Sequence, residues 1–196
     1  MVLIRKLLSQ WQVITLFNAL LLVPAVALSQ PYPNKPISLV VPFVAGGSTD
    51  VTARAIGQKL STALGKQVVV ENKPGGGSTI GVAYVAKAPP DGYTLLFTTI
   101  SLAINAGLRP KLSYDTIKDL QPIIQISSLP LVLVINPNLP PKTLPEFIAY
   151  AKANSGKINY ASSGSGTSPH LAGEMFKTMT GVSMMHIPYK GNAPVL

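Results

Sequence analysis

Apolar residues along this chain fall into short runs separated by segments with helical spacing. Runs over residues 37–43, 67–71 and 93–98 are bounded by loop residues and predict buried strands. Between them, residues 53–64 and 79–87 carry apolar side chains at the spacing of helices. Repeated strand–loop–helix steps are typical of a parallel sheet with crossover helices.

The second half continues this alternation with more loop residues. An apolar run covers residues 123–126, buried strands are predicted over 131–135, 158–161 and 183–187, and helices are predicted after Thr143 and Ser168. Ser168 is expected to cap its helix, because Pro169 follows it at the first helical position.

No helix is predicted after the last predicted strand. A strand in a parallel sheet normally has helices covering both faces, and no helical pattern follows residues 183–187. The sequence therefore predicts a C-terminally truncated second half that leaves Met184, Met185 and Ile187 partly exposed. Exposed apolar side chains forgo burial energy, so we expect an aggregation-prone chain.

Residues 1–29 have the order of a secretory signal peptide. Arg5 and Lys6 form a basic start, residues 13–28 are nearly all apolar, and small residues stand at the −3 and −1 places before Gln30. The alternative is a membrane anchor, for which the apolar stretch is short compared with a span of about 20 residues. The sequence thus predicts cleavage after residue 29 and a periplasmic location.

Composition narrows the functional classes. With 47% hydrophobic and 12% charged residues, the chain is not of the intrinsically disordered class. Cysteine is lacking and histidine occurs only twice, so no thiolate site, metal or cofactor is expected. The net charge is +9, and apart from Arg5 and Lys6 in the predicted signal peptide the basic residues are spread singly, which argues against nucleic-acid binding and favours small anions.

Two glycine-rich loops have the same design. The first glycine loop, residues 42–49, and the second glycine loop, residues 162–168, each run from a predicted strand end into a predicted helix start. Glycine allows the backbone to approach a ligand, and a helix start offers unpaired N–H groups and a positive dipole end. The two loops suggest one small anion held between two lobes, and the alternative is that they are only tight turns.

Motifs for phosphate binding and for hydrolase chemistry are incomplete. The sequence contains no P-loop, no complete dinucleotide fingerprint and no G-x-S-x-G elbow. Ser165 and His170 lie close enough in sequence to suggest a catalytic pair, and no acid is assigned to this histidine. His170 either contacts a ligand or only packs, and His186 is interpreted as structural. Asp50 ties the first glycine loop and complements the helix dipole, or it binds an ammonium group.

Several longer motifs resemble one family, the Bug (TctC-like) family of periplasmic solute-binding proteins of tripartite tricarboxylate transporters. They are YPNKPI at 32–37, VPFxAGGxxD at 41–50, VENKPG at 70–75, APPDGYTLL at 88–96, YASSGxGT at 160–167, HLAGE at 170–174 and HIPYKG at 186–191. The resemblance covers the chain from about residue 32 to its last residue. So many ordered motifs are more specific than one glycine loop.

The resemblance implies an α/β fold of the type II periplasmic-binding-protein (Venus-flytrap) class, with two lobes of mainly parallel sheet. The first lobe would span residues 30–126 and an incomplete second lobe residues 127–196. A small carboxylate would bind in the interdomain cleft of a monomer that serves membrane transporter subunits. The ligand-binding positions carried over are Phe43, Ala45, Gly46, Gly47, Asp50, Thr99, Ser101, Asn105, Ser162, Ser163, Gly164, Gly166, Thr167 and His170.

The leading interpretation is therefore a binding protein without catalytic activity. One alternative is a truncated, nonfunctional remnant of such a protein. A second alternative is a secreted serine hydrolase that uses Ser165 and His170.

Overall fold

The computed structural model describes residues 31–195, so the predicted signal peptide lies outside the described residues. Pro33–Leu196 form one compact unit. In the part of the chain that is described, no helix combines the length and apolar character needed to span a membrane.

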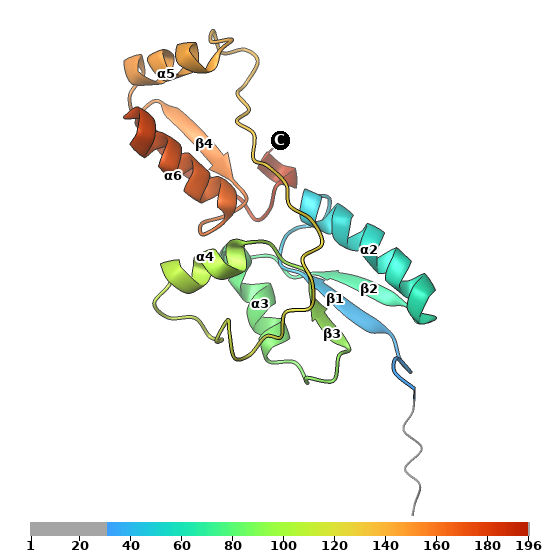
Figure 1. The fold of residues 1–196 in the computed structure, drawn as a ribbon. Coiled ribbons are helices and arrows are strands. Elements are labelled where there is room, and N and C mark those ends of the chain that lie inside the picture. The colour runs from blue at the N-terminus through green and yellow to red at the C-terminus, as the bar shows by residue number, and fades with distance from the viewer. Residues whose placement is uncertain (1–30, 196) are drawn as a thin grey trace, which may run out of the picture. The chain divides into compact units, whose positions relative to one another are not determined.

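The first sheet has three parallel strands, as the sequence pattern predicts, and their order in the structure is β2-β1-β3 (Figure 1). Its elements are β1 (Ile37–Val41), α2 (Ser48–Leu64), β2 (Val68–Asn72), α3 (Thr79–Ala86) and β3 (Thr94–Leu96). In the register, Leu39 lies between Val70 and Leu95. Four of the five β1 residues are buried, which explains why this strand reads as a continuous apolar run.

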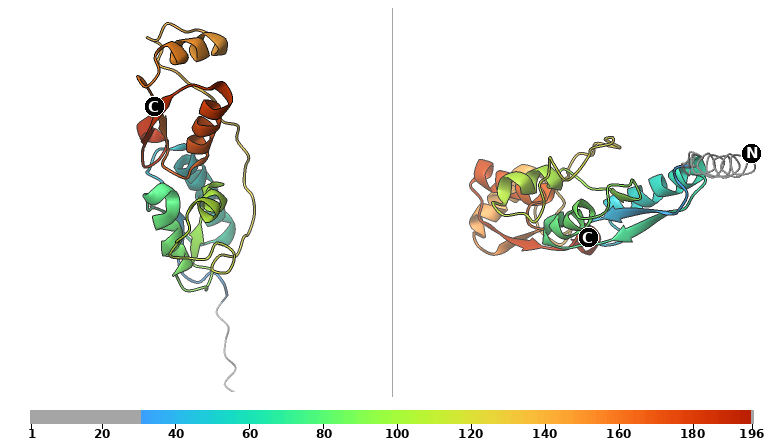
Figure 2. Two further views of the ribbon diagram at one scale, coloured as in Figure 1. Left: turned by 90° about the vertical axis from the view of Figure 1, so that its left-hand side faces the viewer. Right: turned by 90° about the horizontal axis from the view of Figure 1, so that it is seen from below.

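The order of the strands places two loops side by side. The crossover from β1 to β2 leads away from β3, and the crossover from β2 returns past β1 to β3. Because such crossovers are right-handed, α2 and α3 lie on opposite faces of the sheet (Figures 1 and 2). The loops after β1 and β3 therefore flank a topological switch point, where open α/β sheets bind ligands.

The second sheet pairs two parallel strands. Its elements are α5 (Leu144–Ala153), β4 (Ile158–Ser162), α6 (Ser168–Thr180) and β5 (Met184–Pro188). A small core of Phe147, Ala151, Val182 and Met184 joins α5 to this sheet. The strands and helices predicted over this part of the chain are confirmed, with ends that differ by one or two residues.

Two local predictions in this half are wrong. Thr167, not Ser168, is the N-cap of α6, so Pro169 stands at the second helical position. Met184 is only 7% exposed, so the exposure predicted for it is wrong, whereas its neighbour Met185 is 58% exposed, as predicted. Successive residues of a strand point to opposite faces, and the Met184 face is covered by α5.

The predicted strand over residues 131–135 is not observed. Residues 109–143 contain no helix or strand, and several of their apolar side chains face solvent, for example Val132 at 80% and Ile123 at 77% exposed. A strand satisfies its N–H and C=O groups through a neighbouring strand, and no described segment pairs with this stretch. The boundary of the lobes at residues 126 and 127 falls inside it and stays a prediction.

Candidate functional site

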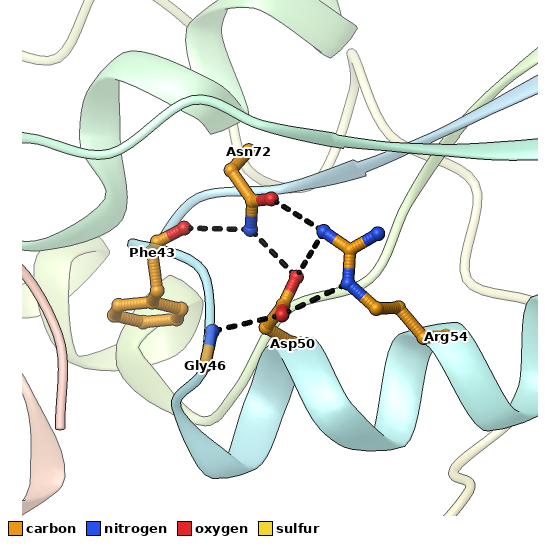
Figure 3. Close-up of polar contacts among 5 residues, drawn as sticks. All are labelled: Phe43, Gly46, Asp50, Arg54 and Asn72. Carbon is orange, nitrogen blue, oxygen red and sulfur yellow. Dashed lines mark hydrogen bonds and ion pairs between the residues drawn. The ribbon is translucent and has the colours of Figure 1, made fainter. Parts of the chain in front are cut away.

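The buried carboxylate of Asp50 holds the first glycine loop in place. The Asp50 side chain accepts hydrogen bonds from the Gly46 N–H (2.9 Å), Arg54 Nε (3.0 Å) and Asn72 Nδ2 (2.8 Å), as Figure 3 shows. Burial by itself raises the pKa of this carboxyl, but the hydrogen bonds from Arg54, Gly46 and Asn72 lower it to about 2. The ionised side chain therefore holds its own loop, in agreement with the interpretation of Asp50 as a tie.

Asn72 completes this anchor, and sequence reasoning gave it no role. Its Nδ2 also donates to the Phe43 carbonyl (3.0 Å), and its Oδ1 accepts from Arg54 Nη2 (2.9 Å) (Figure 3). The available signal was its place at the carboxyl end of β2, where it pairs with Val41 of β1. The parallel register thus brings Asn72 to the loop that follows the neighbouring strand.

The second glycine loop is organised by its own hydroxyls. Ser162 and Thr167 are both 1% exposed, and Ser163 is 6% exposed. Thr167 Oγ1 donates to the Gly164 carbonyl (2.6 Å), and Ser162 Oγ lies 3.1 Å from Gly164 N and 3.2 Å from its carbonyl oxygen. Gly164 has φ +132 and Gly166 has φ +84, conformations that residues with a side chain rarely adopt.

Both histidines lie against this loop. His170 Nδ1 accepts a hydrogen bond from the Gly166 N–H (3.2 Å), and His186 Nε2 lies 2.6 Å from Ser162 Oγ. The two imidazole rings stack with centroids 4.2 Å apart. Burial, and then the nearby His170, lower the pKa of His186 below its ordinary value.

The serine–histidine pair of the hydrolase alternative, Ser165 with His170, is therefore not the one that the structure forms. Ser162 pairs with His186, twenty-four positions away, because β4 and β5 lie side by side. The Nδ1 atom of His170 is engaged by a backbone amide rather than by Ser165. The hydrolase alternative has no support in this arrangement, since neither contact makes Ser165 a nucleophile with an adjacent base.

A third polar segment follows β3 and leads into α4 (Ser101–Leu108). Thr99 Oγ1 and Ser101 Oγ are 2.8 Å apart, and the Ser101 N–H donates to Thr99 Oγ1 (3.3 Å). Asn105, on the same helix, is fully buried. These three predicted positions thus lie together on the β3 side of the switch point.

Asn105 and Arg109 together form what we call the α4 clasp. Asn105 Nδ2 lies within 2.9 Å of the Gly77 carbonyl and 3.4 Å of the Gly166 carbonyl, and its Oδ1 accepts from Arg109 Nε (2.7 Å). Arg109 Nη2 donates to the carbonyls of Gly76 (3.2 Å) and Ser165 (3.3 Å). The clasp therefore joins the second glycine loop to the short helix η1 (Gly76–Ser78).

The α4 clasp depends on glycines at the contact. A Cβ on Gly77 would collide with the Ser165 carbonyl oxygen, and a Cβ on Gly166 would collide with the Asn105 side chain. Gly77 has φ +65, so its backbone also favours glycine. Sequence reasoning singled out Gly166 and Asn105 but gave Gly77 and Arg109 no part in the site.

The segment after β5 runs from the second glycine loop to the first. The Tyr189 N–H donates to the Ser162 carbonyl (2.9 Å), the Val44 N–H donates to the Lys190 carbonyl (3.1 Å), and Asn192 Nδ2 donates to Ser48 Oγ (3.1 Å). The structure thus links both predicted loops through one short stretch of chain.

Two buried hydroxyls at the site have no hydrogen-bond partner among the described residues: Ser78 Oγ, beside Gly77, and Thr98 Oγ1, beside Thr99. Buried hydroxyls normally form hydrogen bonds, so these two are candidate ligand contacts that sequence reasoning missed. Within residues 31–195, no group of three or more acidic, histidine or cysteine side chains could hold a metal ion.

Curated relatives match almost the whole chain. BugT from Bordetella pertussis is 41% identical over 94% of this chain and 57% of its own length. The chain therefore spans little more than half the length of the curated relatives it matches.

Solved structures give the same likeness. A periplasmic transporter has a TM-score of 0.81 at 46% identity, covering 84% of this chain and 55% of its own. Rpa4515 of R. palustris with adipate has a TM-score of 0.80 at 37% identity, and the match covers 84% of this chain and 55% of its own. MatC from Rhodopseudomonas palustris with bound malate has a TM-score of 0.75 at 32% identity, and the match covers 83% of this chain and 56% of its own.

These likenesses confirm the expected two-lobed α/β class, because the matching structures are described as a periplasmic transporter and a periplasmic binding protein, and the described residues of this chain form two parallel sheets. The sequence profile described as "Tripartite tricarboxylate transporter family receptor" matches residues 52–196, which is most of the chain. The chain belongs to this TctC receptor family.

Proposed function

We propose that this chain is the ligand-binding part of a periplasmic receptor that captures a small dicarboxylate for a tripartite tricarboxylate transporter. The observation that carries the proposal is the linkage of three loops at carboxyl ends of parallel strands. The loops after β1, β3 and β4 are tied together by the α4 clasp and by residues 189–192. Such strand ends are where α/β proteins bind ligands.

The chemistry of these loops fits an anion. The helices α2 and α6 have Gly47 and Thr167 as their N-caps, and neither N-cap makes a side-chain hydrogen bond to the helix. The N–H groups of the first helical turns, which Pro169 lacks in α6, therefore receive no side-chain cap and point out of the helix start, where the dipole favours negative charge. Two such helix starts suit a ligand with a carboxylate at each end.

Relatives support the same ligand class. Matching structures carry adipate or malate, both of which are dicarboxylates. The family described for the profile is a transporter receptor, which supports transporter subunits as partners of this chain. We propose further that the protein is a monomer and that it reaches the periplasm after cleavage at residue 29. Its two lobes are proposed to meet near residue 126.

Within the site we assign two kinds of role. Asp50, Asn105 and Thr167 hold the loops, because their polar atoms are engaged by other residues of the protein. The remaining predicted positions are proposed to contact the ligand through backbone groups, through hydroxyl groups or, for His170, through the ring nitrogen that does not bond Gly166: Phe43, Ala45, Gly46, Gly47, Thr99, Ser101, Ser162, Ser163, Gly164, Gly166 and His170. This division explains why a site for an anion contains a buried carboxylate, since Asp50 faces its loop.

Isothermal titration calorimetry of the purified chain with adipate and malate tests the proposal. We expect saturable binding with a Kd on the order of micromolar. Hexane-1,6-diol is the matched control ligand, because it has the length of adipate without its charges, and it should give no heat. A folded chain that binds neither diacid, or that binds the diol equally well, would overturn the proposal. Turnover of simple esters would revive the hydrolase alternative instead.

A further inference from the structure

The two histidines of this sequence are stacked on each other beside the second glycine loop. His170 lies in the first turn of α6 and His186 in β5, and their ring centroids are 4.2 Å apart. Each ring contacts a different part of the loop, through the Gly166 N–H and through Ser162 Oγ. A role in ligand contact alone would not require both rings to bond the loop itself.

Hydrogen bonding selects the protonation state of the pair. His170 must keep Nδ1 free of a proton in order to accept from the Gly166 N–H. Ser162 Oγ has three contacts but only one proton, to His186 Nε2, Gly164 N and Gly164 O. A His186 that carries its proton on Nε2 satisfies all three, because Ser162 then accepts from His186 and Gly164 N–H and donates to Gly164 O.

The charged side chains beside the two histidine rings are Glu174 and Lys177, and they do little to balance a positive charge on a ring. Tyr160 of β4 stacks on His186 at 4.9 Å, and its hydroxyl donates to Glu174 Oε1 (2.6 Å). Lys177 donates to both oxygens of Glu174 at 2.9 Å. Glu174 is thus already paired, and Lys177 adds a positive charge near the rings. A proton on either imidazole places a further positive charge in this stack.

We propose that His170 and His186 are positioning residues, and that the second glycine loop is fully held only while Nδ1 of His170 carries no proton. A proton on His170 Nδ1 removes the acceptor for the Gly166 N–H, and charges on both rings at once repel each other across the stack. Mildly acidic pH therefore loosens the loop and weakens ligand binding. The last consequence depends on the proposed dicarboxylate function, whereas the effect on the loop does not.

Nuclear magnetic resonance of the full chain tests the loop directly, because there are only two histidine ring signals to follow. Between pH 8 and pH 5, the Gly166 amide signal should move together with the ring signals of the histidine pair. The Gly46 amide is the internal control, since its acceptor is Asp50, and it should stay unchanged. A Gly166 amide that ignores both ring titrations would overturn the proposal even if no variant can be prepared.

Two variants separate positioning from general destabilisation. His170→Asp keeps an acceptor at the position that Asp50 occupies in the first glycine loop, so the Gly166 amide should lose its response between pH 8 and pH 5. His170→Leu removes the acceptor, and the Gly166 amide should exchange with solvent at least tenfold faster at pH 7.5. Equal exchange in the leucine variant and the unmodified chain would contradict the positioning role.

Calorimetry with adipate then tests the link to function. We expect the affinity of the unmodified chain to fall at least tenfold from pH 7.5 to pH 5.0, and that of His170→Asp to fall less than threefold. An affinity of the unmodified chain that is constant over this range would overturn the link. An absence of adipate binding at every pH would contradict the dicarboxylate function, while the amide titration would still decide the loop.

Discussion

The first and second glycine loops are built to the same plan but are anchored by different chemistry. In each, the third residue of the following helix accepts a hydrogen bond from a glycine N–H four positions earlier. Asp50 accepts from Gly46 at 2.9 Å, and His170 accepts from Gly166 at 3.2 Å. A carboxylate performs in one loop what an imidazole performs in the other.

This difference decides how each loop responds to pH. The pKa of Asp50 is about 2, so its acceptor is present throughout the range in which the protein would work. An imidazole loses its acceptor when both nitrogens carry protons. Two loops of similar geometry can therefore differ in their response to pH: the first glycine loop keeps its anchor, and the second loses its anchor when the imidazole is protonated.

The largest expected effect comes from removing the constant anchor. Asp50→Ala leaves the Gly46 N–H, Asn72 and Arg54 without their shared acceptor, and it should lower the free energy of unfolding by about 3 kcal/mol. Urea denaturation measures this loss. Asp91→Ala is the matched control, because Asp91 is an exposed carboxylate paired with Lys35, and its loss should be much smaller. Equal losses in both variants would show that Asp50 does not anchor the loop.

Replacing one glycine of each loop with alanine should affect the stability of the protein to different degrees. Gly166→Ala forces a side chain into a backbone with φ +84 and against Asn105, and it should cost about 2 kcal/mol of stability. Gly47→Ala meets no atom closer than 3.6 Å at an ordinary φ of −79, so its stability should change by less than about 0.5 kcal/mol.

Adipate binding then separates the two roles in these variants. Gly47→Ala should weaken binding although it leaves the fold intact, because the added methyl group lies at the helix start proposed to bind the carboxylate. Unchanged affinity in Gly47→Ala would indicate that the first glycine loop is only a turn. Thermal unfolding in the same buffer provides the stability values for both variants.

The pH dependence of stability should have two separate windows. The pKa of His186 is lowered from 6.5, so the unfolded chain binds more protons than the folded chain below that value, and stability falls as pH drops through 6.5. Asp50 stabilises the fold fully above 3.8, and this contribution, about 2 kcal/mol, is lost as pH falls toward 2. Melting temperatures from pH 8 to pH 2 measure both windows. In His186→Gln the upper window should shrink while the lower one remains, and a lower window that shrinks equally would contradict this assignment.

The smallest expected effect is that of salt on ligand affinity. Anion binding by helix starts and hydroxyls in a desolvated site should change less than about threefold between low and physiological ionic strength. Calorimetry with malate at the two salt concentrations measures it. A steep loss of affinity would place the binding site among the dispersed surface lysines and would weaken the comparison of the two loops.

Much of this protein could be predicted from local sequence. The apolar runs gave the strands of both sheets, and Gly65 and Gly181 end α2 and α6 in the left-handed conformation that glycine favours. The positions of both glycine loops and the family resemblance could also be predicted from short stretches of sequence. These features depend on residues that are neighbours in the chain, so a short window of sequence contains their causes.

Tertiary structure alone decided which side chains hold the site together. The parallel register of β4 and β5 brings His186 to Ser162, and the approach of the loops brings Arg109 to Ser165 and Gly76. The same dependence on distant partners explains why residues 131–135, apolar enough for a strand, form none. Strand pairing and clasp contacts join residues that are far apart in sequence, and no local pattern records which partner will be present.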